Sequence, residues 1–407
     1  MKKGWQTKTL GEICDIERGG SPRPIQEFIT TAPNGINWIK IGDATASGKY
    51  IYKTEEKIKP EGVKRSRMVY EGDFILSNSM SFGRPYIMKT TGCIHDGWLV
   101  LHQPKVDPDY LYHALSSDLV FDQFDRLAAG STVRNLNIGL AKSVEIPYPP
   151  LAEQQRIVGV LDEAFAGLAT AKANAEKNLQ NARALFESHL QSVFTQRGAN
   201  WDNVTLETLL ERGWIESHLD GNHGGDYPRK EEFIQKGVPY ISANCLDDDD
   251  RIDMSRAKYL SPTRAALLRK GIAKNNDVLF AHNATVGPVA MLQTDEEKVI
   301  LGTSLTYYRC NARHILPEYL AHYMRSFGFK KQYLQVMGQS TRNQVPITKQ
   351  REFFHVIPPL EEQKRIIVAL DGLLENGQRL ARLYERKLAA LSALKKSLLH
   401  QAFTGEL

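Results

Sequence analysis

The sequence has little of what a disulfide-rich, zinc-binding or membrane-spanning chain needs. Only four of its 407 residues are cysteine, and they lie far apart without a CxxC pair. This spacing argues against a zinc site and against a dense disulfide framework. No uninterrupted apolar run approaches the ~20 residues of a transmembrane helix, and no apolar signal-peptide stretch follows the two N-terminal lysines. These absences predict a protein of the reducing cytoplasm with no membrane partner.

A strong excess of charge of one sign is also lacking. The chain has 52 Lys and Arg against 47 Asp and Glu, a net charge of +5. This total neither shows nor excludes a nucleic-acid partner, because only clustering of charge on one face decides that. The length suggests two to four domains at ~100–200 residues each. The apolar fraction of 42% and charged fraction of 24% are typical of a globular chain.

Motifs that carry catalysis are present only as fragments. GDATASGKY (42–50) has one residue too many between its glycines for a phosphate-binding loop, and Tyr50 replaces the Ser or Thr that would bind Mg²⁺. YPPL (148–151) departs from the amino-methyltransferase loop at both functional positions. PDY (108–110) is not followed by the carboxylate and lysine of a nuclease, and DDDD (247–250) lacks the rest of a calcium loop. We therefore predict no catalytic residue, metal site or cofactor in this chain.

An internal repeat dominates the sequence. PPLAEQQRIVGVLD (149–162) returns as PPLEEQKRIIVALD (358–371), and residues 149–195 and 358–404 share 17 identities in 47 positions at a constant offset of 209. An ungapped match of this length indicates a tandem duplication.

Each copy of the repeat predicts a long helix. Prolines stand at its start and nowhere deeper. Apolar or small residues alternate at spacings of four and three, the heptad pattern of a coiled coil. At ~1.5 Å per residue, ~44 residues extend ~65 Å, too far for one neighbouring globule to bury the stripe. We expect the two copies to pair with each other. The alternative, two unrelated surface helices, is disfavoured by their shared register.

The segments before the two helices resemble each other in the order of their predicted elements but not in residue identity. Both contain a Gly/Pro-rich turn, short β-branched runs that predict strands, and a matching helix, PDYLYHAL (108–115) and PEYLAHYM (317–324). WIKIGD (38–43) and PYISAN (239–244) are two of the expected strands. The predicted fold class is α+β, with α/β domains at 1–148 and 198–357 joined by helices at 149–197 and 358–407.

Polar and basic side chains gather in loops at matching places of the two blocks. Lys and Arg neutralise phosphates, while Asn, Gln, Arg and His can read base edges. The alternative is that each is an ordinary solvated loop residue. As a set, repeated in position but different in identity, they predict two surfaces that bind two different DNA sequences. In the first block the candidates are Arg18, Ser21, Arg23, Lys64, Arg65, Arg67, Asn78, Ser81, Arg84, Arg134 and Asn135. In the second they are His223, Arg229, Arg264, Arg269, Lys270, His282, Asn283, Thr285, Arg342 and Asn343.

The chain resembles the specificity (S) subunit of type I restriction–modification systems. The resemblance is carried by the motif PPL-x-EQ-x-RI-x₃-LD, which occurs twice, each time after an α/β block and at the start of a long helix. The resemblance covers essentially the whole chain. It implies that the blocks are target recognition domains and that the helices form an antiparallel coiled coil. It also implies double-stranded DNA as ligand and two modification subunits as partners, which use S-adenosylmethionine to methylate adenine at N6. Up to two restriction subunits, which use ATP and Mg²⁺, would then join.

The repeated helix starts are the expected docking places for two identical partners, because a pseudo-two-fold pair offers two equivalent faces. The candidate residues are Glu153, Gln154, Arg156, Glu362, Gln363 and Arg365. The alternative is that they only cap and anchor the helix starts. A related system, in which the partner fuses methylation and cleavage, remains a second functional interpretation.

Overall fold

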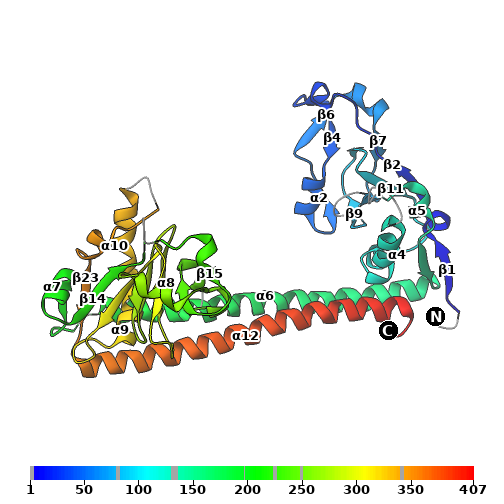
Figure 1. The fold of residues 1–407 in the computed structure, drawn as a ribbon. Coiled ribbons are helices and arrows are strands. Elements are labelled where there is room, and N and C mark those ends of the chain that lie inside the picture. The colour runs from blue at the N-terminus through cyan, green and yellow to red at the C-terminus, as the bar shows by residue number, and fades with distance from the viewer. Residues whose placement is uncertain are drawn as a thin grey trace. The chain divides into compact units, whose positions relative to one another are not determined.

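The computed structural model describes residues 4–78, 83–129, 136–196, 198–222, 227–247, 251–339 and 343–407. The chain divides into unit 1, Met1–Glu176 with Glu385–Leu407, and unit 2, Lys177–Tyr384. The division falls inside two 45-residue helices, α6 (Leu151–Thr195) and α12 (Leu360–Thr404) (Figure 1). Each unit therefore contains one block and one segment of each helix. In the described part of the chain, no helix is both long enough and apolar enough to cross a membrane.

Unit 1 contains two five-stranded sheets and a two-stranded ribbon. The outer sheet has the order β3 (Ile29–Thr30), β6 (Glu56–Ile58), β4 (Ile36–Ile39), β10 (Gly92–Ile94), β7 (Arg67–Val69). The inner sheet has the order β2 (Asp15–Arg18), β11 (Trp98–His102), β8 (Phe74–Ser77), β9 (Pro85–Met88), β5 (Tyr50–Ile51). The ribbon pairs β1 (Gln6–Thr9) with β12 (Glu145–Tyr148).

Unit 2 repeats this topology almost strand for strand. Its outer sheet has the order β15 (Phe233–Ile234), β17 (Lys258–Leu260), β16 (Val238–Ile241), β21 (Val299–Leu301), β18 (Ile272–Ala273). Its inner sheet has the order β14 (Ile215–Asp220), β22 (Leu305–Cys310), β19 (Val278–Asn283), β20 (Thr285–Met291), and among the described residues of this unit no strand corresponds to β5. The ribbon pairs β13 (Asp202–Thr205) with β23 (Phe354–Ile357). The shared strand order confirms that the two blocks are related.

Short helices flank the sheets in both units, and the first helix and the last three helices of each unit match in order. Unit 1 has α1 (Leu10–Ile13), α2 (Ile41–Ser47), α3 (Pro108–Leu115), α4 (Asp118–Ala129) and α5 (Ile138–Lys142). Unit 2 has α7 (Leu206–Glu211), α8 (Pro262–Leu267), α9 (Pro317–Arg325), α10 (Phe327–Gly338) and α11 (Ile347–Gln350). Two expectations are corrected, because neither WIKIGD nor PYISAN forms a single strand. In WIKIGD the strand ends at Ile39, and Asp43 accepts the Lys40 backbone N–H at 2.8 Å, which begins α2 instead. In PYISAN the strand ends at Ile241, and a 3₁₀ turn begins at Ala243.

The inner sheet of each unit is buried on both faces. Along β8, Phe74 and Leu76 point into the core that contains the helices, while Ile75 between them points into the core shared with the outer sheet. In β19, Phe280 and Leu279 divide between two cores in the same way. The two-residue period of a strand produces this division. Each block is therefore three layers deep, with helices, inner sheet and outer sheet.

The long helices pack antiparallel. In unit 1, Leu161 near the start of α6 shares a core with Leu399 and Phe403 near the end of α12. In unit 2, the end of α6 packs on the start of α12, where Phe194 and Leu370 share a core. Figure 1 shows the two helices side by side. The predicted fold class, with an antiparallel helix pair, is confirmed.

Small residues of the predicted seam allow the helices to approach closely. Ala175 and Ala182 of α6 and Gly377 of α12 are buried. A Cβ built at Gly377 would lie 3.2 Å from the backbone oxygen of Ala182, so the heptad spacing places these residues on the paired faces. Lys172, which the same four-and-three spacing places on the seam between Leu168 and Ala175, is exposed instead.

Candidate nucleic-acid interface and helix anchors

Four candidates of unit 1 converge on the turn that precedes β11. The Ser21 hydroxyl donates to the Asp96 carboxylate at 2.5 Å, and an Arg23 guanidinium nitrogen lies 3.5 Å from the same carboxylate. Arg18 Nε and Asn78 Nδ2 donate to the Asp96 carbonyl oxygen at 3.0 and 2.9 Å. The Ser21 hydrogen bond, aided by His95 and Arg23, holds the pKa of Asp96 below its usual range. Asp96 therefore stays ionised and orders this turn.

A second basic loop of unit 1 lies beside this turn. Ser66 donates its hydroxyl to the Ile94 carbonyl oxygen at 2.9 Å. Lys64 and Arg65 are exposed, as is Arg67 at the start of β7, which pairs with Glu17 on β2 at 3.2 Å. The structure thus brings together two basic segments that are about 40 residues apart in the sequence. Arg23, with 80% of its side chain exposed, remains available to a phosphate although it lies near Asp96.

In each unit a glycine allows two backbone segments to approach each other closely. A Cβ at Gly19 would collide with the His95 carbonyl oxygen, and one at Gly221 would collide with the Gly302 carbonyl oxygen. Both glycines directly follow the first strand of the inner sheet, β2 or β14, and both meet the loop after the matching strand of the outer sheet. The same backbone crossing, with different neighbouring side chains, therefore underlies both candidate surfaces.

Unit 2 joins its corresponding loops through Asn222. Its Nδ2 donates to the Lys270 carbonyl oxygen at 2.8 Å, which places the exposed Lys270 and Arg269 beside the glycine turn. Arg229 is exposed, whereas Arg264 lies 2.6 Å from the Glu232 carboxylate. Glu232 thus offsets part of the positive charge on this surface.

A third segment of unit 2 is the tight turn between β19 and β20. Asn283 and Thr285 flank Ala284, which has a left-handed φ of 63°. The Asn343 side chain donates to the Ala284 carbonyl oxygen, and the Ala284 N–H donates to the Asn343 carbonyl oxygen at 3.0 Å. Asn343 and Thr285 are exposed, so their positions suit contact with DNA.

Three candidates lie away from exposed binding surfaces. Asn78 is 1% exposed and His282 is 3% exposed. His282 Nδ1 contacts the Val345 carbonyl oxygen at 3.0 Å, so both residues order loops from within. Arg84 is exposed but stacks over Tyr86, 5.3 Å from the ring centre, on the helical side of unit 1. Ser81, Arg134, Asn135, His223 and Arg342 lie outside the described residues.

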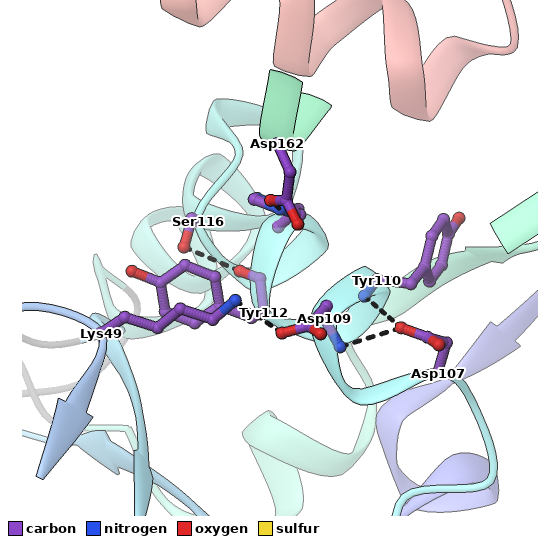
Figure 2. A network of polar contacts seen from close by, with 8 residues as sticks. Lys49, Asp107, Asp109, Tyr110, Tyr112, Ser116 and Asp162 are labelled. Carbon is purple, nitrogen blue, oxygen red and sulfur yellow. Dashed lines mark hydrogen bonds and ion pairs between the residues drawn. The ribbon is translucent and has the colours of Figure 1, made fainter. Parts of the chain in front are cut away.

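The repeated helix start holds each block to its long helix. In unit 1, Gln154 is 2% exposed; its Oε1 accepts the Asp107 backbone N–H at 2.8 Å and its Nε2 donates to the Pro149 carbonyl oxygen at 2.8 Å. Asp107 is the N-cap of α3, and its carboxylate accepts two N–H groups of that helix. Figure 2 shows these last two bonds. One glutamine therefore fixes the start of α3 on the start of α6.

Unit 2 repeats the contact with Gln363, which is fully buried. Its Oε1 accepts the Leu316 N–H at 2.9 Å, and its Nε2 donates to the carbonyl oxygens of His314 and Pro358 at 2.8 and 2.9 Å. Buried amides that satisfy backbone groups in this way stabilise the fold. Of the two roles predicted for Gln154 and Gln363, the structure gives them the anchoring role, because burial leaves neither amide open to another protein.

A histidine and an aspartate make a second repeated contact. His113 of α3 meets Asp162 of α6 at 2.9 Å, and His322 of α9 meets Asp371 of α12 at 2.7 Å. Both imidazoles are almost fully buried, whereas both carboxylates are exposed. Burial lowers the pKa of His113, and Asp162 partly opposes this. In Figure 2, Asp162 reaches from α6 toward α3.

A buried tyrosine makes the third repeated contact. The Tyr110 hydroxyl donates to the Pro147 carbonyl oxygen at 2.8 Å, and the Tyr319 hydroxyl donates to the Val356 carbonyl oxygen at 2.6 Å. Each tyrosine also packs edge-on against a phenylalanine near the end of the other long helix. The ring centres are 5.3 Å apart for Phe403 and 5.8 Å apart for Phe194. These contacts explain why the helix starts, the helix ends and the PxYLxH segments repeat together.

The comparison with protein families agrees with this duplicated arrangement. The model of the type I restriction modification DNA specificity domain matches residues 2–179 and again residues 201–384. The chain belongs to this family.

Relatives span nearly the full length of this specificity-domain protein. It is 22% identical over 424 residues to the EcoBI specificity subunit of Escherichia coli, with 99% of this chain and 86% of that one covered. It is 28% identical over 441 residues to the putative MjaX specificity subunit of Methanocaldococcus jannaschii, with 100% and 94% covered. The HsdS subunit from Thermoanaerobacter tengcongensis has a TM-score of 0.63 at 20% identity, with 100% and 98% covered. A chain from a study of assembly and conformational transition of the type I R-M system has a TM-score of 0.80 at 20% identity, with 100% and 99% covered. At these identities the structural likeness shows the fold.

The four remaining docking candidates of this specificity-domain chain are accessible. Arg156 forms a two-pronged pair with Glu153 at 2.7 and 3.0 Å and donates to the Leu407 carbonyl oxygen at 2.8 Å. Arg365, with 80% of its side chain exposed, lies 3.5 Å from Glu362. Their contact with a partner stays a prediction.

Sequence reasoning missed the residues that order the candidate surfaces. Asp96 is a lone acidic residue in a polar loop, and Glu232 directly follows another acid, Glu231, so neither residue gives a signal of its own. The His113–Asp162 contact had a signal, since both residues repeat at the offset of 209 that marks the helices. The repetition alone does not show that the two residues meet, because their contact depends on the packing of α3 against α6.

Proposed function

We propose that this chain is the sequence-specific DNA-recognition subunit of a type I restriction–modification complex. Its two recognition blocks read the two halves of an asymmetric, bipartite site, with block one at 1–148 and block two at 198–357. The observation that carries this proposal is the doubled specificity domain, in which one backbone plan presents two different sets of loop side chains. Two unlike surfaces on one plan suit two unlike half-sites.

The exposed basic residues supply the expected contacts with DNA. In unit 1 these are Arg23, Lys64 and Arg65, and in unit 2 they are Arg269 and Lys270. Their charges neutralise phosphates, so binding weakens steeply as salt rises. Asn343 and Thr285 offer hydrogen bonds to base edges in the second half-site.

The chain recognises DNA without catalysing its modification. It docks two modification subunits, and up to two restriction subunits then join, all in the cytoplasm. The two helix starts, each with an ion pair whose arginine is exposed, Glu153–Arg156 and Glu362–Arg365, suit two identical partners. Purified chain incubated with DNA and labelled S-adenosylmethionine should transfer no methyl group by itself; any transfer would contradict this assignment.

Exchange of one block tests the division of labour between the two. Replacement of residues 1–148 by the first block of a relative, assembled with the modification subunit, should change one half of the methylated site. Sequencing of the methylated positions measures the result. The matched exchange of residues 198–357 should change only the other half. Two altered halves after a single exchange would refute the proposal.

The long helices determine the spacer between the half-sites in this proposal. Deletion of one heptad from each helix preserves their seam and shortens each by about 10 Å. The spacer in the methylated site should then become shorter by about 3 base pairs, at 3.4 Å per base pair. An unchanged spacer would show that other elements determine the distance.

A further inference from the structure

Unit 1 has a hollow of about 820 Å³ on its helical side. Its walls are the segment 83–85 before β9, one face each of α3 and α4, and single side chains of the long helices, among them Phe165 of α6 and Leu399 of α12. The hollow is thus built from a recognition block and both long helices. The candidate DNA-binding turn around Asp96 does not contribute to it.

The same positions of the repeat line two smaller hollows in unit 2, of about 600 and 520 Å³. Every lining residue of the unit 1 hollow except Lys395 has its counterpart, at an offset of 204 or 209, in the lining of one of these two. Phe165 corresponds to Leu374 and Leu399 corresponds to Leu190. A single ancestral hollow is therefore present twice, whole in unit 1 and divided in unit 2.

One position divides the hollow. Ser116 of unit 1 is short and exposed, and its hydroxyl donates to the Tyr112 carbonyl oxygen at 2.7 Å (Figure 2). Its counterpart is Arg325, whose side chain lines both hollows of unit 2. Arg325 Nε and Nη2 donate to the Val289 carbonyl oxygen at 3.3 and 3.2 Å, so the guanidinium is held across the gap.

The walls suit a protein segment better than DNA. Phe121 at the unit 1 hollow is 40% exposed. Phe327 and Leu334, at the smaller of the two unit 2 hollows, are 57% and 45% exposed. Exposed aromatic and aliphatic side chains beside a hollow are typical of protein interfaces. Asp118 and Asp125 stand beside Arg84 and Lys395 in the unit 1 wall, so the wall has mixed charge and lacks the excess of positive charge that attracts a phosphate backbone.

We propose that the hollow at α3–α4 and its counterpart at α9–α10 each receive an apolar-tipped segment of one modification subunit. Because the hollow occurs twice at repeated positions, its occupant comes as two copies of the same partner. The two sites are unequal, since Ser116 leaves the first open whereas Arg325 blocks the middle of the second. The first modification subunit therefore binds at unit 1, and the second binds more weakly at unit 2. This inference rests on the proposed function, which supplies the partner.

Titration of the purified chain with the modification subunit of its own system, followed by native mass spectrometry, tests the order of binding. The wild-type chain should bind one copy before the second. Ser116→Arg copies the blocked geometry into unit 1 and should weaken the first binding step about tenfold. Arg325→Ser opens the second site and should tighten the second step by a similar factor.

Matched controls separate a specific effect from a general one. Ser116 and Ser143 are both exposed C-cap serines with helical backbone angles, and Ser143 does not line the hollow. Ser143→Arg should therefore bind both copies as the wild type does, and Arg313→Ser is the control for Arg325→Ser. Binding of both copies by Ser116→Arg with wild-type affinities would overturn the inference and leave the proposed function intact. A wild-type chain that bound no modification subunit would overturn both.

Discussion

Replacement of Gln154 by leucine should loosen the first block from α6. Gln154 is buried and satisfies two backbone groups, the Asp107 N–H and the Pro149 carbonyl, at 2.8 Å each. Leucine has a similar size but cannot make either bond. Buried polar groups left without a partner cost ~1–3 kcal/mol each, beyond the ~1 kcal/mol that a hydrogen bond contributes. Allowing for partial relaxation and the added apolar burial, we expect unit 1 to lose about 2–4 kcal/mol of unfolding free energy.

Calorimetric melting measures this loss. For a unit of this size, 1 kcal/mol corresponds to roughly 2–4 °C, so the unit 1 transition should fall by roughly 4–16 °C. The adjacent Gln155 is exposed, and Gln155→Leu is the matched control, with an expected change within about 0.5 kcal/mol. Gln363→Leu should lower the unit 2 transition by at least as much, because Gln363 makes three such bonds. Equal melting of the Gln154 and Gln155 variants would refute the anchoring role.

Three further predictions follow from the contacts described above. Gly19→Ala should destabilise unit 1 by several kcal/mol, from a clash with the His95 carbonyl, and should weaken DNA binding; Gly42→Ala, in α2 with open space around its Cβ, should leave binding unchanged and should not lower the melting temperature. Tyr319→Phe should cost about 1–2 kcal/mol in urea unfolding by removing the bond to the Val356 carbonyl, whereas Tyr52→Phe, at a 65% exposed position, should cost nothing measurable. Burial lowers the pKa of His218 to about 3 and that of His355 to about 4, from 6.5; the unfolded chain thus takes up these protons first, and unit 2 should lose about 2 kcal/mol per histidine between pH 7 and pH 5. Urea unfolding at the two pH values measures this loss, and a pH-independent midpoint would contradict the burial argument.

Much of the architecture could be predicted from the repeat. The constant offset of 209 indicated two related helices, and the spacing of Leu161, Ala175 and Ala182 indicated which face of α6 is buried. Heptad periodicity is a local property, since residues three and four apart lie on one side of a helix whatever surrounds it. The relation between the two blocks was predicted from a few matching phrases. The strand orders confirm this relation even for segments in which no constant difference in residue number aligns the two blocks.

The candidate surfaces could be predicted only in part. Basic residues of two loops were expected to act together, and the structure places Arg23 and Lys64 in adjacent loops. Asp96, which supports Arg23, gave no signal because its partners Arg18, Ser21 and Arg23 lie 73 to 78 residues earlier in the chain. Asn78 and His282 were expected on the surface, yet both are buried. A polar residue just after a strand can turn to solvent or inward, and local sequence is the same in both cases.

The sequence by itself determined the duplication, the two long helices and the face on which they pair, because covalent order and helical periodicity express these features locally. Only the tertiary structure decided that Gln154 and Gln363 face inward as anchors, and that Ser116 and Arg325 make two copies of one hollow unequal. These outcomes depend on strands and helices far apart in the chain that meet across a shared core. The free energy of packing two such elements depends on both of them, so neither segment alone determines it.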